Sequence, residues 1–253
     1  MLSRALADRA AILDAVSHHP FARFIAGMSS DLRGIIVNGY GTGPAVLWWG
    51  DSPLGRLGHG IGDPAGLDAA VAHAREQGVL DGVARINLPR RTEIPPGWVV
   101  NEDWDYCWLP APDAAVPTQP NQDEVGPEDD AEAIAALLDV AFPDSMLRPG
   151  HPMVNEWYAA RCGGVLVACA ADRSVRSRDP DAVPTGVVGA VAVHPDHRGR
   201  GWGAAVTAAL ARVLTERYAL VGLGVTADNH TAQRLYARLG FTGRHEITSI
   251  RPA

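Results

Sequence analysis

The chain of 253 residues contains no lysine: all 22 of its basic residues are arginine. Schiff-base formation and a lysine general base are therefore excluded, which leaves histidine, tyrosine and carboxylates for acid–base chemistry. Cysteine is scarce as well. Cys107, Cys162 and Cys169 are too few and too scattered for a disulfide framework or a zinc cluster, so we expect free thiols and no metal site.

Long apolar runs and a positive charge balance are also missing. No apolar run approaches the length of about 18 residues that a membrane-spanning helix needs, and the first residues lack the apolar core of a signal peptide. The net charge of -7 repels phosphate backbones and anionic lipids at long range. We therefore expect a cytoplasmic globular protein whose partners include neither nucleic acid nor a membrane. Monomer and homodimer both stay open.

The length and one change in composition predict two domains. A chain of this size fits two ordinary cores better than one. Residues 113–130 concentrate Pro, Asp, Glu, Gln and Asn and have almost no large apolar side chains, which is typical of a linker. We predict an N-terminal α/β domain at 1–112, an acidic, proline-rich linker at 113–130 and a second domain at 131–253.

Apolar spacing gives the elements of each half. In the first, it predicts an amphipathic helix over Leu2 to Val16, a second from Pro20, a hairpin of 35–40 and 45–49 about Gly41-Thr42-Gly43, a helix from Asp63-Pro64 to Gln77, and strands at 83–88 and 98–108. In the second, the order is helix, three strands, helix, strand, helix, strand. The third of these strands, 186–194, is apolar on both faces and should lie centrally in a mixed α/β (α+β) sheet.

The densest signal is the segment Val191 to Val206, VAVHPDHRGRGWGAAV, in which a buried strand leads through a glycine-rich turn into a helix. Glycines permit positive φ and a close approach of the backbone, and free amides at a helix start face an anion. A flexible turn is the alternative, but three glycines in five residues weaken a helix start, and neighbouring arginines repel each other without an anion. The residues concerned are His197, Arg198, Gly199, Arg200, Gly201 and Gly203.

The same glycines also satisfy the dinucleotide fingerprint, as Gly199-x-Gly201-x-x-Ala204. Its context argues against that function, because too few residues follow for the further strands of a doubly wound domain. The phosphate loop of nucleotide triphosphatases requires a lysine, which this chain lacks.

The segment resembles the GCN5-related N-acetyltransferase (GNAT) superfamily, whose signature Q/R-x-x-G-x-G/A reads here as Arg198, Gly201 and Gly203. A later block, Asn229-x-x-Ala232-x-x-x-Tyr236-x-x-x-Gly240-Phe241, resembles that family's next helix and strand. The resemblance covers the C-terminal half. It implies a GNAT-like fold with splayed central strands, acetyl-CoA as co-substrate, and a primary amine of a small molecule, amino acid or peptide as acceptor.

The resemblance also implies site residues. The loop amides would hold the coenzyme A pyrophosphate, the amide of Val193 would polarise the thioester carbonyl, and Tyr236 would protonate the departing thiolate. Tyr236 also has the helical spacing of a core residue, and Asn229 is equally suited to capping a helix. The coenzyme-binding residues implied are Val191, Val193, Arg198, Gly199, Arg200, Gly201, Trp202, Gly203 and Asn229.

The general base stays open. Many members of the superfamily carry a Glu on the central strand, whereas residues 186–193 contain no titratable side chain. The candidates elsewhere are Asp144, His151, Glu156 and His194, and the segment 142–157 is expected to line the acceptor pocket. A non-catalytic acyl-CoA sensor is the competing hypothesis, because lost chemistry would also leave the strand without a carboxylate.

The first half has an element order similar to a degenerate acetyltransferase half, and tandem arrangements of this kind occur in the superfamily. Residues 57–63 would be the decayed phosphate loop. Asp51 and Asp63 flank this segment and Arg56 is its only fixed cation, so a pyrophosphate would meet repulsion there. We expect a structural or substrate-shaping role, with Asp63 as a helix cap.

Overall fold

A computed structural model of the chain describes residues 2–39, 43–111, 115–175 and 184–253. The N-terminal half contains β1 (Leu2–Leu6), α1 (Arg9–Ala15), α2 (Pro20–Met28), β2 (Ser30–Asn38), β3 (Ala45–Ser52), β4 (Gly55–Ile61), α3 (Pro64–Glu76), β5 (Arg85–Pro89) and β6 (Trp98–Trp108). The C-terminal half contains η1 (Gln122–Glu124), β7 (Val125–Glu128), α4 (Ala131–Ala141), β8 (Glu156–Cys162), β9 (Val165–Asp172), β10 (Gly186–Val193), η2 (Pro195–His197), α5 (Trp202–Arg217), β11 (Val221–Thr226), α6 (His230–Arg238) and β12 (Gly243–Pro252).

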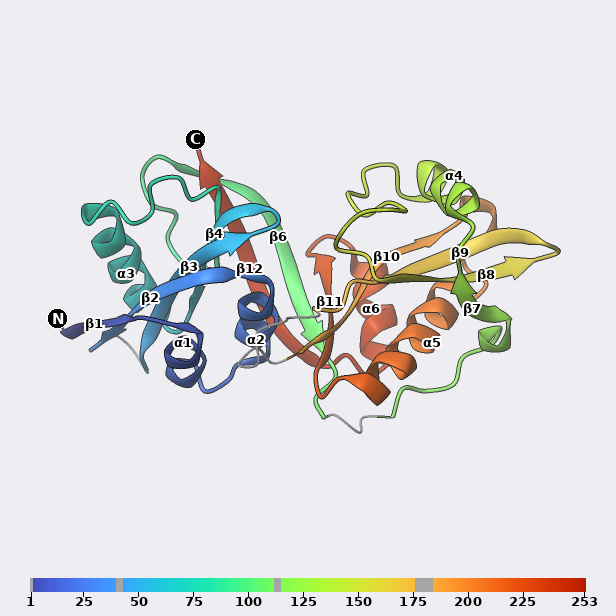
Figure 1. Cartoon of the computed structure of the whole chain (residues 1–253), viewed down its shortest axis with the longest axis horizontal. Helices are drawn as coiled ribbons and strands as arrows, with labels where there is room; N and C mark the ends of the chain where they lie inside the picture. The colour runs from blue at the N-terminus through green and yellow to red at the C-terminus, as the bar shows by residue number, and fades with distance from the viewer. Residues whose placement is uncertain (1, 40–42, 112–114, 176–183) are drawn as a thin grey trace.

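The strands of the described residues form one sheet in the order β1-β2-β3-β4-β5-β12-β6-β11-β10-β9-β8-β7. The two halves lie side by side, and β6 and β12 cross between them (Figure 1). Counted from either edge inward, five strands of one half are followed by a strand that comes from the other half of the chain. In the N-terminal half β12 pairs with β5, and in the C-terminal half β6 pairs with β11. This repeated topology agrees with the expected tandem arrangement.

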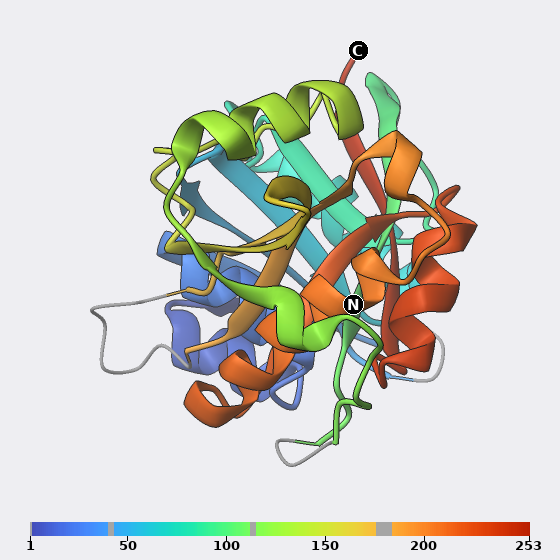
Figure 2. The ribbon, with the colours of Figure 1, turned by 90° about the vertical axis from the view of Figure 1, so that its right-hand side faces the viewer.

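The repeat extends to the connections. The pairs β4–β5 and β10–β11 are parallel, and α3 and α5 respectively connect their strands. In the C-terminal half, α4 packs on one face of the sheet and α5 with α6 on the other (Figures 1 and 2). No helix among the described residues is long and apolar enough to cross a membrane.

Most of the predicted elements are confirmed. Pro20 begins α2, Asp63 caps α3 by accepting the amide proton of Ala65, and β2 and β3 form the predicted antiparallel hairpin. Gly41 and Thr42 of its turn lie outside the described residues, as do residues 113 and 114 of the predicted linker. The strand β10 lies between β9 and β11, which confirms its central position.

The first predicted helix is wrong over its N-terminal part. Leu2–Leu6 is the edge strand β1, paired antiparallel with β2, and the helix α1 begins only at Arg9 after the cap Asp8. Leu6 and Leu13 are both buried, but from two elements. Apolar spacing alone does not separate a short strand followed by a helix from one longer helix.

The proposed decayed phosphate loop is instead largely the strand β4. Its glycines serve packing: a Cβ at Gly60 would stand 2.8 Å from side-chain carbons of Leu67 and Leu88. Only Gly62 and Asp63 then connect β4 to α3, whereas eight residues, 194–201, connect β10 to α5. The N-terminal half therefore lacks the loop length that a pyrophosphate site needs.

The predicted linker also contains structure. Within it, η1 is followed by β7, which pairs antiparallel with β8 and forms the outer edge of the sheet. Arg161 of β8 forms ion pairs with Glu128 at 2.8 Å and with Asp130 at 3.2 Å. Two acidic residues of the predicted linker therefore attach β7 to β8. Pro127 within β7 suits an edge strand, because proline cannot donate a ladder hydrogen bond.

Candidate active site

The central strands of the C-terminal half separate partway along their length. β10 pairs with β11 only from Gly186 to Val188, although β11 continues to pair with β6 as far as Thr226. The pairing of β10 with β9 shifts register between Gly189 and Ala192, and Ala190 has a φ of 45°. A β-bulge bends its strand, so the described residues leave an opening between β10 and β11 beyond Val188.

A glycine-rich loop follows the end of β10 and leads into α5. Gly199 and Gly201 have φ values of 74° and 87°, and a Cβ at either would have no atom within 4 Å. Gly201 is the N-cap of α5 and provides no side-chain cap, and the first helical bond runs from the amide of Ala205 to its carbonyl. The preceding amides of the first turn are thus free to bind an anion at the positive end of a 16-residue helix.

Polar contacts hold this loop from outside. The guanidinium of Arg198 donates to the carbonyls of Val193 and of Ala141 at the end of α4, both at 3.3 Å. Asn121 donates from its amide to the carbonyl of Arg200 at 3.1 Å. Arg198 therefore orders the loop, while the exposed Arg200 leaves its charge in solvent beside it. Sequence reasoning missed Asn121, which lies in the predicted linker.

The start of α5 packs closely on its neighbours. A Cβ at Gly203 would stand 3.4 Å from side-chain carbons of both Val193 and Leu235. A Cβ at this position would make ordinary van der Waals contact, so packing alone does not require a glycine here. The side chain of Trp202 is buried in the same core cluster, which leaves its backbone amide to face a ligand.

Tyr236 lies on α6 in the core cluster that also contains Trp202, with 8% of its surface exposed. Burial raises the pKa of Tyr236 to about 12, and nearby Cys107 adds to this. The phenol is therefore protonated at neutral pH and is suited to donate a proton. Asn229 accepts the amide proton of Ala232 at 3.0 Å, so its side chain caps α6.

A cavity of about 500 Å³ borders the opening between β10 and β11. Both halves line it: Gly189 and Ala190 of β10 and the segment 224–226 of β11 meet residues of α2, β4, β5 and β6. Of the four candidate bases from the sequence, Asp144 lines this cavity, together with Phe142 and residues 145–147 of the segment expected to form the acceptor pocket. The sequence analysis did not predict that residues of the N-terminal half line this cavity, because no sequence pattern indicates which distant segments meet there.

A second depression, of about 630 Å³, lies in the N-terminal half between α1, α2 and β3. It is more open, and its charged residues are those of the surface, such as Asp31 and Asp51. It does not touch β10, β11 or the glycine-rich loop. The cavity of about 500 Å³ is therefore the better candidate for the active site.

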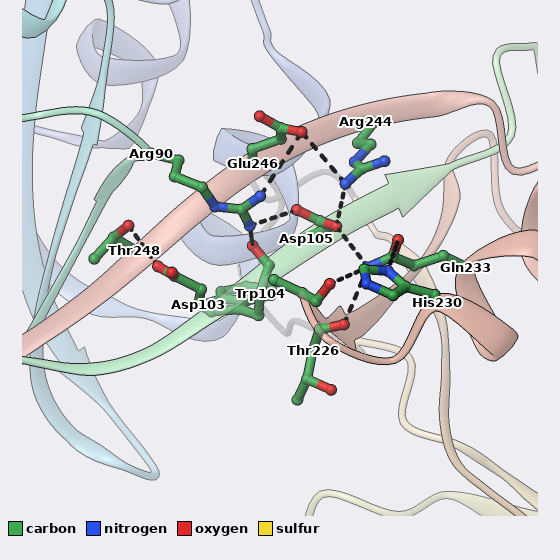
Figure 3. A network of polar contacts seen from close by, with 11 residues as sticks. Arg90, Asp103, Trp104, Asp105, Thr226, His230, Gln233, Arg244, Glu246 and Thr248 are labelled. Carbon is green, nitrogen blue, oxygen red and sulfur yellow. Dashed lines mark hydrogen bonds and ion pairs between the residues drawn. The ribbon is translucent and has the colours of Figure 1, made fainter.

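A polar network beneath α6 joins the exchanged strands (Figure 3). The fully buried Asp105 of β6 accepts from Arg90 and from Arg244 of β12, each at 2.7 Å. Gln233 of α6 donates to the same carboxylate at 3.3 Å and to the carbonyl of Ala227 at 2.9 Å. The network therefore fixes the helix that carries Tyr236 to the crossing of the two halves.

Comparisons with known proteins agree with this arrangement. Residues 121–241 match the model of the acetyltransferase (GNAT) family. No curated protein matches the chain. Among solved structures, the fold is similar to that of a GCN5-related N-acetyltransferase from Sphaerobacter thermophilus, with a TM-score of 0.56 and 18% identity over 100% of this chain and 96% of the other. An acetyltransferase from the GNAT family of Colwellia psychrerythraea gives a TM-score of 0.56 and 11% identity over 99% of this chain and 100% of the other.

The two structural likenesses extend over both halves and concern the fold, whereas the family model covers the part of the chain that contains the glycine-rich loop, the opening between β10 and β11, and α6. Through residues 121–241 the chain carries an acetyltransferase domain of the GNAT family, which is a family of acyltransferases.

Proposed function

We propose that the protein transfers an acetyl group from acetyl-CoA directly to a primary amine of a small molecule, amino acid or peptide within a ternary complex. The observation that supports the proposal most strongly is that the opening between β10 and β11 is bordered both by the glycine-rich loop, which suits the coenzyme, and by the cavity, which suits the acceptor. The glycine-rich loop continues from the end of β10, and the cavity touches β10 at Gly189 and Ala190.

The loop fits the coenzyme. The uncapped amides at the start of α5 and the open space at Gly199 and Gly201 suit a pyrophosphate, with Arg200 as a nearby positive charge. The part of β10 from Val191 to Val193 runs along the opening, where a backbone amide would polarise the thioester carbonyl. In this proposal Asn229 supports the site through its helix cap.

The proposed transfer uses Tyr236 of α6 as the acid and a carboxylate of the cavity as the base. The amine nitrogen forms a bond to the acetyl carbon, the carbon–sulfur bond breaks, and the leaving thiolate takes the proton of Tyr236. The amine proton goes to a base, and the carboxylates that line the cavity are Asp144 and Glu102. Glu102 already faces Arg85 at 3.9 Å, so Asp144 is the better candidate.

The N-terminal half shapes the acceptor side and does not form a second site of this kind. In its parallel pair β4–β5, His59 and Asn87 are register partners whose side chains contact each other at 3.2 Å and line the cavity. Its short connection to α3 offers no anion-binding loop. The half instead supplies α2, β4, β5 and β6 to the cavity wall.

A non-catalytic acyl-CoA sensor is the second candidate, because β10 carries no carboxylate. Two measurements test the candidates: the first tests coenzyme binding, which both require, and the second separates them. Acetyl-CoA at about one hundred times its dissociation constant should stabilise the fold by about 2.7 kcal/mol, whereas NADH should produce no shift. A panel of primary amines, followed by release of the coenzyme thiol, then tests transfer: thiol release with at least one amine supports the enzyme, and stabilisation without any thiol release supports the sensor.

A further inference from the structure

The cavity contains a guanidinium that has no acidic partner among the described residues. Arg173 directly follows β9, and its amide donates to the carbonyl of Val187 at 2.9 Å, which fixes its backbone beside β10. Its side chain reaches α2 of the other half, where Nη2 lies 3.9 Å from Sδ of Met28 and Cζ lies 5.9 Å from the ring centre of Phe24. Its buried Nε has no hydrogen-bond partner.

The position of this side chain relates it to the opening between β10 and β11. A Cβ at Gly189 would stand only 2.6 Å from Cδ of Arg173 and 3.1 Å from Leu147. The absence of a side chain at Gly189 therefore lets Arg173 lie across β10. Ala190, where the strand bulges, is the next residue. The guanidinium is thus held at the border of the proposed reaction site.

In the described part of the chain, the side chain of Arg173 adjoins Met28, Phe24 and Tyr106, none of which carries a negative charge at neutral pH. The nearby Tyr106 is fully buried, and burial raises the pKa of its phenol, which stays neutral. The other charged group beside this phenol is Arg23 of α2, again a cation. Burial lowers the pKa of Arg173, as expected where a cation has lost water without gaining an anion. Such a group is costly to keep in the folded protein unless it binds a ligand.

The other ionisable groups of the cavity do not neutralise it. Glu102 faces Arg85, and Asp144 is exposed at the segment after α4. Burial lowers the pKa of His59 to about 3, so this imidazole is neutral at physiological pH. Among the described residues, the cavity thus combines a fixed cation without a counter-charge and a separate carboxylate, a pattern that complements a small zwitterion.

We propose that Arg173 binds a carboxylate of the acceptor, so that the substrate is an amine that also carries a carboxylate, of the amino acid class. This inference rests on the proposed function and narrows its acceptor. A planar guanidinium takes a carboxylate through two parallel hydrogen bonds. With the carboxylate held beside Gly189, an amino group a few bonds away points into the opening between the strands. A cavity of about 500 Å³ suits a ligand of that size.

The experiment compares amino acids with their carboxamides, which keep the amine and the side chain but lose the negative charge. Wild-type protein should acetylate the preferred amino acid about 10- to 100-fold more efficiently in kcat/KM than its carboxamide, the range expected for a charged hydrogen bond. Arg173→Gln should reduce this ratio to about twofold by slowing the amino acid alone. Arg173→Lys should retain part of it.

Arg23→Gln is the matched control, since Arg23 adjoins the same phenol but does not line the cavity. This variant should preserve the preference for the carboxylate. Unchanged stabilisation by acetyl-CoA checks that each variant is folded. Should Arg173→Gln fail to fold, the wild-type ratio still decides: equal efficiencies for amino acids and carboxamides overturn the inference while leaving the acetyltransferase proposal intact.

Equilibrium binding separates the two proposals further. Calorimetry in the presence of coenzyme A measures the affinities of N-acetyl amino acids, the expected products, and of their carboxamides. Tighter binding of the carboxylates that depends on Arg173 supports the inference, even if no amine in the panel is acetylated and the transfer proposal fails. Binding that ignores the carboxylate, or no binding by any carboxylate, overturns it.

Discussion

The fully buried carboxylate of Asp105 lies 2.7 Å from the partly exposed guanidinium of Arg244, although Asp105 belongs to the last strand of the N-terminal half and Arg244 to the last strand of the chain. Their contact exists because β6 and β12 pair with each other along most of their length while each also completes the other half's part of the sheet. The two halves therefore share their cores at the crossing, and we expect them to unfold together.

Asp105→Asn tests this crossing. The change keeps the side-chain shape but removes the charge that Arg90 and Arg244 share, while Glu246, 3.7 Å from Arg90 and 3.3 Å from Arg244, stays as a partner of both. We expect a loss of about 2 kcal/mol in the free energy of unfolding, within the range for hydrogen bonds to a charged group. Asp103→Asn is the control on the same strand, where an exposed carboxylate binds Thr248, and it should lose about 1 kcal/mol or less. Denaturant unfolding measures both, and equal effects would argue against a central role for Asp105.

Gly201→Asp should abolish acetyl-CoA binding in a protein that still folds. No atom lies within 4 Å of a Cβ there, so the fold tolerates the side chain apart from the strain of its φ of 87°, but the carboxylate would face the site of the pyrophosphate. Gly97→Asp is the control, because Gly97 has a φ of 81° and equally open space but lies far along the chain from the loop. Calorimetric titration with acetyl-CoA provides the measurement; full affinity in folded Gly201→Asp would reject the loop assignment.

Tyr236→Phe should lower turnover on the order of 100-fold and leave the affinity for acetyl-CoA nearly unchanged, because the phenol proton assists only the transition state. Tyr158→Phe is the control: Tyr158 belongs to the same core cluster and is 6% exposed, so it shares burial without the proposed role. Steady-state kinetics compares the two variants. A turnover of Tyr236→Phe within twofold of the wild type would mean that this tyrosine only packs.

The free energy of unfolding should fall between pH 6.5 and 4 because of buried histidines. Burial lowers the pKa of His59 to about 3, and that of His245 to about 4, so the unfolded chain takes up these protons first as the pH falls. The contribution of His59 is complete above its unfolded pKa of about 6.5 and declines by about 1.4 kcal/mol for each pH unit below it. His59→Gln cannot be protonated and should flatten this decline, whereas the exposed His230→Gln should not. Urea unfolding at pH 7 and pH 5 makes the comparison, and parallel losses in all three proteins would contradict the assignment.

The sequence by itself determined the glycine-rich loop on which the proposed coenzyme site rests. Glycines at 199 and 201 between a buried strand and a helix are a local pattern, and local backbone geometry is what such a pattern controls. The order of elements in the C-terminal half was readable for the same reason, since each depends on apolar spacing within a few residues. The sequence predicted a helix where Leu2–Leu6 form a strand, and a loop where β4 lies. At both places the residue pattern suits a strand as well as the predicted element.

Only the tertiary structure decided which residues meet across the molecule. The exchange of β6 and β12, the ion pair of Asp105 with Arg244, and the cavity wall from α2 depend on pairings between distant parts of the chain, which leave no periodic signal in either part. Arg173 is the clearest case: its sequence neighbours mark only the end of a strand. Gly189 leaves room for the arginine side chain, Phe24 and Met28 of α2 contact it, and no acidic side chain among the described residues pairs with it.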